Sequence, residues 1–151
     1  MNTTTTTQPV SLKVSRLIKA PRERVFAAWT TPTEIARWLG GDKCQIEKAT
    51  IDARVGGAYH FKMKGSDAGK PGMTGVYREV KPPERLVFTW MTGSCNEEMA
   101  RVETLVTVEF TAQAGGTLVQ ITHAGFPTEE LCEQHNYGWT ASFDKLEKLV
   151  Q

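Results

Sequence analysis

The stretch TEELCEQHNYGWTASFDKLEKLV, residues 128–150, decides the fold, because no other segment has the length and the period of a major helix. Thr128 supplies an N-cap hydroxyl, and acidic residues follow in the first turn, where the helix dipole favours them. Five large side chains recur at spacings of three and four residues, which places them on one side of a helix. They are Leu131, His135, Trp139, Phe143 and Leu146. Nearly everything before this segment is patterned as strands, so we expect a curved sheet that grips one long helix.

The residues before this helix predict a strand, two short helices and then a run of strands. The first strand covers residues 10–19. Pro21 suits the first turn of a helix over 22–30, and Gly40 and Gly41 end a second helix over 33–39. The further strands are predicted over 44–55, 58–64, 73–80, 85–91, 101–112 and 117–124. Short turns between successive strands favour an antiparallel meander.

Alternation along the strands predicts which side chains point inward. Within 58–64, Tyr59, Phe61 and Met63 share one face, and within 85–91 the inward set is Leu86, Phe88 and Trp90. In the strand over 101–112, valines alternate with two glutamates, Glu103 and Glu109. Inward valines would leave both glutamates in solvent. A slip of one residue would exchange the two faces, and this alternative stays open at the level of sequence.

Length and composition predict one ordinary globular domain over residues 10–151, preceded by a disordered polar tail over 1–9. The 18 basic and 17 acidic residues leave a net charge of +1, which argues against nucleic-acid binding. No apolar run approaches the roughly 18 residues of a membrane span. The three cysteines are scattered, which is typical of free thiols in a reducing compartment; they are Cys44, Cys95 and Cys132. The start of the chain lacks a signal-peptide pattern. We therefore expect a cytoplasmic protein.

Six strings of the sequence, taken together and in order, resemble one protein family. They are APRERVFAAWTTPTEIARWLGG (20–41), IDARVGGAYHFKM (51–63), PPERLVFTW (82–90), TLVTVEF (104–110), ITHAGFP (121–127) and GWTASFDKLEKL (138–149). The family is that of the activator of heat-shock-protein-90 ATPase homologue-like proteins. It lies within the START/Bet v 1-like superfamily of helix-grip proteins, also called SRPBCC. The resemblance covers residues 11–150.

This resemblance implies an α+β helix-grip fold, in which a seven-stranded antiparallel sheet wraps around the C-terminal helix and two short helices follow the first strand. The superfamily commonly holds lipids, sterols, polyketides or other apolar molecules in a cavity between sheet and helix. The eukaryotic namesake stimulates a chaperone ATPase, whereas most short relatives have no established activity. One departure is RWLGG over residues 37–41, where many relatives carry two tryptophans and Gly-Pro. It affects the expected shape of the cavity mouth.

A concave sheet under a single helix leads to the hypothesis that a ligand cavity is lined by inward-facing side chains from both. The predicted lining residues are Phe61, Met63, Tyr77, Phe88, Trp90, Val106, His123, Trp139 and Phe143. Three of them, Tyr77, Trp90 and His123, carry polar tips that would orient a ligand. The alternative interpretation is that the same side chains form a plain core.

His123 invites two interpretations, because it shares a predicted strand face with Val119 and Ile121. An imidazole with an ordinary pKa of about 6.5 can act as an acid or base in a pocket. The alternative is a buried neutral histidine that is bonded to a backbone carbonyl.

Cys132 and His135 lie one helical turn apart, but a metal site needs three or four ligands. With no nucleophile elbow and no phosphate-binding loop, we expect no catalytic residue, metal or cofactor.

The sequence thus predicts non-catalytic binding of a small hydrophobic ligand, such as a lipid-, sterol- or polyketide-like molecule. One alternative is a protein-interaction module that acts on a chaperone ATPase. Another is a cyclase or hydrolase that uses the same cavity, with His123 and a nearby carboxylate or tyrosine as the acid/base pair. Open edge strands are compatible with a monomer or a homodimer.

Overall fold

The computed structural model of the 151-residue chain describes residues 10–40, 45–64, 72–93 and 101–151. Its elements are, in chain order, β1 Val10–Ile18, α1 Arg22–Thr30, α2 Pro32–Trp38, β2 Ile46–Ile51, β3 Ala58–Met63, β4 Met73–Lys81, β5 Arg85–Met91, β6 Glu103–Gln113, β7 Gly116–Phe126 and α3 Glu129–Val150. The predicted tail over 1–9, together with Cys44 and Cys95, lies outside the described residues.

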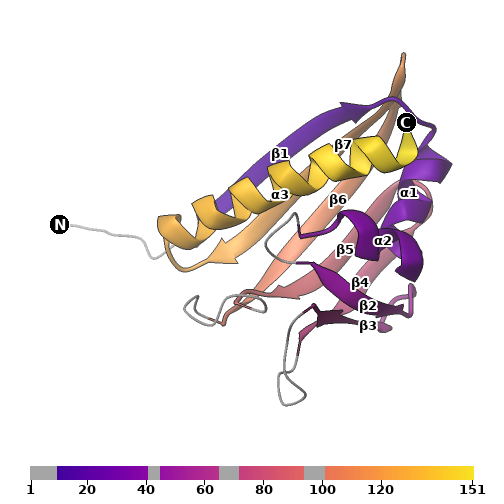
Figure 1. Ribbon diagram of the computed structural model, residues 1–151. Helices are drawn as coiled ribbons and strands as arrows, with labels where there is room; N and C mark the ends of the chain where they lie inside the picture. Colours follow the sequence, from indigo (N-terminus) through magenta and orange to yellow (C-terminus); the bar gives the residue numbers. More distant parts are fainter. Residues whose placement is uncertain (1–9, 41–44, 65–71, 94–100) are drawn as a thin grey trace.

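The strands form one antiparallel sheet in the order β1-β7-β6-β5-β4-β3-β2. Helix α3 runs across one face of this sheet, over β1 and β7, while α1 and α2 lie beside its C-terminal end (Figure 1). The core fills the space between the sheet and the three helices. This arrangement confirms the predicted α+β helix-grip architecture. None of the helices in the described ranges is long and apolar enough to cross a membrane.

The predicted boundaries agree closely with the structure, and two of the differences have a clear cause. Helix α1 and strand β5 match the prediction residue for residue. Strand β2 ends at Ile51 instead of Val55, because the following residues form a turn in which the Arg54 N–H donates to the Asp52 carbonyl over 2.8 Å. Strand β7 extends to Phe126, because β1 continues to pair with it there.

The inward faces of the strands are the predicted ones. Val106 and Val108 have no exposed surface, whereas Glu103 and Glu109 on the same strand are exposed. The alternative register, in which the glutamates would face the interior, is therefore wrong. The alternation in β3 and β5 is also confirmed, with Tyr59, Phe61 and Met63 buried on one face of β3.

A bulge at Gly125 interrupts the alternation of β7. Strict alternation after His123 would turn Gly125 inward and Phe126 outward. Instead the pairing with β1 shifts between Val10 and Ser11, and Gly125 takes a φ of 103° that other residues rarely adopt. Phe126 consequently returns to the interior, where its ring centre lies 4.4 Å from that of His123.

Helix α3 begins as its sequence predicts. The Thr128 hydroxyl accepts a hydrogen bond from the Leu131 N–H over 3.2 Å, and two glutamates occupy the first turn. Leu131, Trp139 and Phe143 are buried against the sheet, and His135 is half-buried. The predicted apolar side of the helix is thus the side that faces the core.

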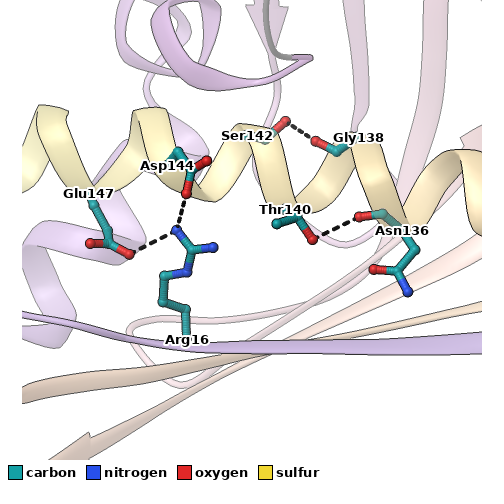
Figure 2. A network of polar contacts seen from close by, with 7 residues as sticks. All are labelled: Arg16, Asn136, Gly138, Thr140, Ser142, Asp144 and Glu147. Atoms are coloured by element: carbon teal, nitrogen blue, oxygen red, sulfur yellow. Dashed lines mark hydrogen bonds and ion pairs between the residues drawn. The ribbon is translucent and has the colours of Figure 1, made fainter.

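Arg16 of the edge strand β1 forms ion pairs with two acidic residues of α3 (Figure 2). Its guanidinium donates to Asp144 over 2.6 Å and to Glu147 over 2.9 Å, and it lies 5.7 Å from the ring centre of Phe143. Because Asp144 is largely exposed, water and salt weaken the first pair. The first pair therefore adds little stability, while the two bonds together join α3 to β1.

Gly138 offers a direct test of this description of α3. Glycine in the middle of a helix lowers stability, and a Cβ at this position would meet no atom within 4 Å. We expect Gly138→Ala to raise the free energy of unfolding by roughly 0.5–1 kcal/mol. Urea unfolding should show a higher midpoint with an unchanged slope. As a control, Gly75→Ala should destabilise, because its Cβ would overlap the Thr89 carbonyl oxygen and the Tyr59 ring. A lower midpoint for Gly138→Ala would contradict the described helix.

Candidate functional site

A small cavity lies between the concave face of the sheet and the three helices. Its lining residues are Trp29, Ile35, Leu39, Tyr59, Phe61, Tyr77, Phe88, Trp90 and Trp139. We call these nine side chains and the space between them the aromatic cavity. The space amounts to about 10 Å³, which is room for about one water molecule. Six of the nine are large aromatic side chains from the sheet or α3, so the cavity is mainly apolar.

Two sets of elements build this cavity. Strands β3, β4 and β5 carry Tyr59, Tyr77 and Phe88, whose ring centres lie 5.8–5.9 Å apart in pairs. The turn between β2 and β3 fixes the position of Tyr77: the Gly56 N–H donates to the Tyr77 carbonyl, and the Tyr77 N–H donates to the Gly57 carbonyl, each over 2.9 Å. The facing wall comes from the helices, and there Trp139 stacks on Trp29 with ring centres 5.8 Å apart.

The phenol groups of the cavity are neutral. Burial raises the pKa of both Tyr59 and Tyr77 above the ordinary value, because a phenolate would lose its hydration. The Tyr59 hydroxyl donates to the Thr89 carbonyl over 2.6 Å. Among the described residues, no charged side chain lines the cavity. It therefore offers apolar surface and neutral polar groups to whatever occupies it.

The four tryptophans differ in how their indole N–H groups are satisfied. Trp38 donates to the Ala28 carbonyl over 2.9 Å, and Trp139 donates to His123 over 3.0 Å. The N–H groups of Trp29 and Trp90 are buried and have no hydrogen-bond partner among the described residues. A buried donor without a partner costs about 1–3 kcal/mol. Both of these tryptophans line the aromatic cavity.

A chain of hydrogen bonds runs through His123 beside the cavity. An indole N–H only donates, so the Nδ1 atom of His123 must accept from Trp139. We therefore assign the ring proton to Nε2, which donates to the Thr104 hydroxyl over 2.7 Å, and that hydroxyl donates to the Trp90 carbonyl over 3.0 Å. We call these contacts the His123 chain. They leave neither ring nitrogen of His123 free to transfer a proton.

His123 is held in its neutral form. It has no exposed surface, and loss of hydration is the main reason why its pKa falls to about 2, with the neighbouring His135 as a second cause. His135 donates through Nδ1 to the Leu131 carbonyl over 2.9 Å, and burial lowers its pKa as well. The described residues contain no group of three or more His, Cys, Asp or Glu side chains arranged to hold a metal ion.

The structure brings together five of the nine predicted lining residues, namely Phe61, Tyr77, Phe88, Trp90 and Trp139. The other four lie in the surrounding core and do not line the cavity; they are Met63, Val106, His123 and Phe143. All nine are buried.

The sequence-based hypothesis missed four lining residues, Trp29, Ile35, Leu39 and Tyr59. Tyr59 carried a usable signal, because it shares a strand face with Phe61. Ile35 and Leu39 have the four-residue spacing of one helix face, and Trp29 lies on the apolar side of α1. The family resemblance placed residues 37–41 at the mouth of the cavity, but no pattern in the sequence itself indicated that side chains of α1 and α2 line it.

Comparison with known proteins gives a family match over residues 19–151, to the family described as Activator of Hsp90 ATPase homolog 1-like protein. A comparison with curated proteins gives no match. Among solved structures, protein CV1439 from Chromobacterium violaceum is similar with 28% identity and a TM-score of 0.74, covering 93% of this chain and 96% of that one.

Two further solved structures share the fold. The AHSA1-like protein from Aeromonas hydrophila has 28% identity and a TM-score of 0.73, covering 93% of this chain and 92% of that one. CalU16 from Micromonospora echinospora has 23% identity and a TM-score of 0.69, covering 95% of this chain and 77% of that one. The latter likeness concerns the fold alone.

The His123 chain predicts how stability depends on pH. The folded state holds His123 at a pKa below its unfolded value, so the unfolded chain binds the extra proton first as the pH falls. The contribution of His123 to the free energy of unfolding is therefore fully present above about pH 6.5. Below that pH it falls, by up to about 1.4 kcal/mol per pH unit. Urea unfolding between pH 7.5 and 5 measures the slope, to which His135 also contributes.

Two variants isolate the contribution of His123. His123→Leu is destabilised at every pH, because Trp139 loses its acceptor, but it should show a smaller slope. Thr104→Ser keeps the hydroxyl and should retain the slope. Nitrogen-15 spectra of the imidazole should show the Nε2–H form at pH 5. Protonation of His123 near pH 6.5 in the folded protein would contradict the assigned chain.

Proposed function

The chain belongs to the family of Activator of Hsp90 ATPase homolog 1-like proteins, and we propose that it binds a small, mainly apolar molecule in the aromatic cavity. The observation that carries this proposal is the lining itself: nine buried side chains, most of them aromatic, converge from sheet and helices on one residual space. Ligand sites of proteins are typically concave and apolar, with a few polar groups that fix orientation.

Binding in this cavity requires its walls to separate. Pockets for drug-sized molecules have volumes of about 300 Å³ or more, far above the roughly 10 Å³ described here. Moving the strands apart would break the backbone ladder, whereas moving α2 breaks mainly side-chain contacts. One bond joins the end of α2 to α3: the Gly40 N–H donates to the Ser142 hydroxyl over 2.9 Å. We therefore place the entry at α2, whose Ile35 forms part of the wall.

The geometry gives less support to the alternatives. An acid/base role for His123 requires an accessible ring nitrogen, and both nitrogens are engaged inside the core. Contact with a chaperone ATPase stays a prediction from the family. The large exposed apolar side chains among the described residues are spread over different elements; they are Leu17, Val55, Val76, Leu105 and Tyr137.

The proposal predicts where an apolar probe binds. A bicyclic probe such as tetralin or 1-tetralone should form a one-to-one complex in native mass spectra. It should also change tryptophan fluorescence, because three of the four tryptophans line the cavity. Intermolecular NOEs should connect the probe with the rings of Tyr59, Tyr77 and Phe88.

Tyr137 provides an internal control within the same spectra. It lies on α3 as Trp139 does, but it is 74% exposed. NOEs to Tyr137 without any to the lining rings would indicate adsorption on the surface and would overturn the proposal. Absence of any complex across a panel of apolar probes would overturn it as well.

A further inference from the structure

Two buried donors distinguish the aromatic cavity from a plain apolar core. The side chains of Trp29 and Trp90 are 2% and 7% exposed, and neither indole Nε1–H has a hydrogen-bond partner among the described residues. The other two indoles, of Trp38 and Trp139, are both satisfied. The unpartnered donors are therefore not scattered through the core, because both belong to side chains that line the cavity.

An unpartnered buried N–H lowers the stability of the folded state enough to need an explanation. Each such group loses its hydration without gaining a hydrogen bond in return, and native proteins contain few of them. Trp29 does lie edge-to-face against Trp38, with ring centres 4.6 Å apart. Contacts of an N–H with an aromatic face are, however, second-order compared with a bond to oxygen. A molecule that brings an acceptor oxygen into the cavity would remove this cost.

The surroundings also restrict the charge of that molecule. Aromatic rings can attract a cation, but a cation could not accept a hydrogen bond from the two unpartnered indole N–H groups. A carboxylate would be buried without a cationic partner, because the lining of the cavity contains no charged side chain in the part of the chain that the structure describes. Burial also keeps the Tyr59 and Tyr77 hydroxyls neutral. The remaining chemistry is a neutral acceptor such as a ketone, ester or ether oxygen.

We infer that the ligand is a neutral apolar molecule with an acceptor oxygen, and that this oxygen accepts a hydrogen bond from the indole N–H of Trp29, of Trp90, or of both. The inference rests on the proposed function and adds the chemical class of the ligand. Trp29 enters from α1 and Trp90 from β5, so the acceptor is held between the helical wall and the sheet.

A pair of matched probes tests the inference. Tetralin and 1-tetralone share one bicyclic skeleton and differ in a single carbonyl group. With indole nitrogen-15 labelling, 1-tetralone should shift the Nε1–H signal of Trp29, Trp90 or both downfield, and tetralin should not. The signals of Trp38 and Trp139 should keep their positions, because those donors are already bonded. Trp→Phe variants assign the four signals.

The affinity ratio of the two probes gives a second readout. In the double variant Trp29→Phe/Trp90→Phe, which keeps aromatic rings but removes both donors, the preference for 1-tetralone over tetralin should fall about tenfold. Trp38→Phe is the matched control: it removes an indole donor that is bonded to the Ala28 carbonyl and does not line the cavity, so the ratio should stay unchanged. If the double variant fails to fold, the wild-type indole signals decide the question.

The outcomes separate the two proposals. If both probes bind in the cavity but neither the Trp29 nor the Trp90 signal responds to 1-tetralone, the inferred ligand chemistry is wrong and the proposed function stands. An unchanged affinity ratio in a folded double variant leads to the same conclusion. If neither these two probes nor any other of the apolar panel binds, the proposed function fails, and the inferred chemistry fails with it.

Discussion

The His123 chain joins helix α3 to three strands of the sheet. It begins at Trp139 on α3, passes through His123 on β7 and Thr104 on β6, and ends at the Trp90 carbonyl on β5. Each step is a bond between buried groups, so loss of one member leaves its partner unsatisfied. The chain fixes the ring of Trp139, which lies 5.8 Å from Trp29 and 5.1 Å from Trp90. The hydrogen bond from Trp139 to His123 thus holds one ring of the helical wall of the aromatic cavity in place.

The bulge at Gly125 completes this arrangement. Without it, continued alternation in β7 would carry Phe126 to the solvent face. With it, Phe126 packs 4.4 Å from the His123 ring and 5.0 Å from the His135 ring, and it has no exposed surface. This packing removes water from around both imidazoles, which favours their neutral forms. One glycine conformation therefore supports the electrostatic state of the His123 chain.

Sequence periodicity was enough to predict the elements, because each depends on neighbours within one segment. The seven strands and the cap at Thr128 are of this kind. The outward position of Glu103 and Glu109 needed the structure, because a slip of one residue would exchange the two strand faces. The cavity lining was only partly predictable, because it depends on which faces converge in space. The wall formed by Ile35 and Leu39 requires α2 to pack against β2 and against α3, which is far from it in sequence. The sequence likewise does not predict which indole N–H groups have a hydrogen-bond partner, because the partners come from distant segments of the chain.

A core filled with aromatic rings and a binding role are compatible on energetic grounds. A filled core gains packing that an open pocket would forgo. A protein with nothing to bind, however, gains nothing from leaving two indole donors without partners, since phenylalanine at either position would avoid that cost. A site that is built to hydrogen-bond an oxygen rejects an apolar analogue far more strongly than shape alone allows, because the analogue leaves buried groups unpaired. In the proposed site, the two indoles would therefore supply what the apolar walls lack, which is a means of discriminating between molecules of similar size.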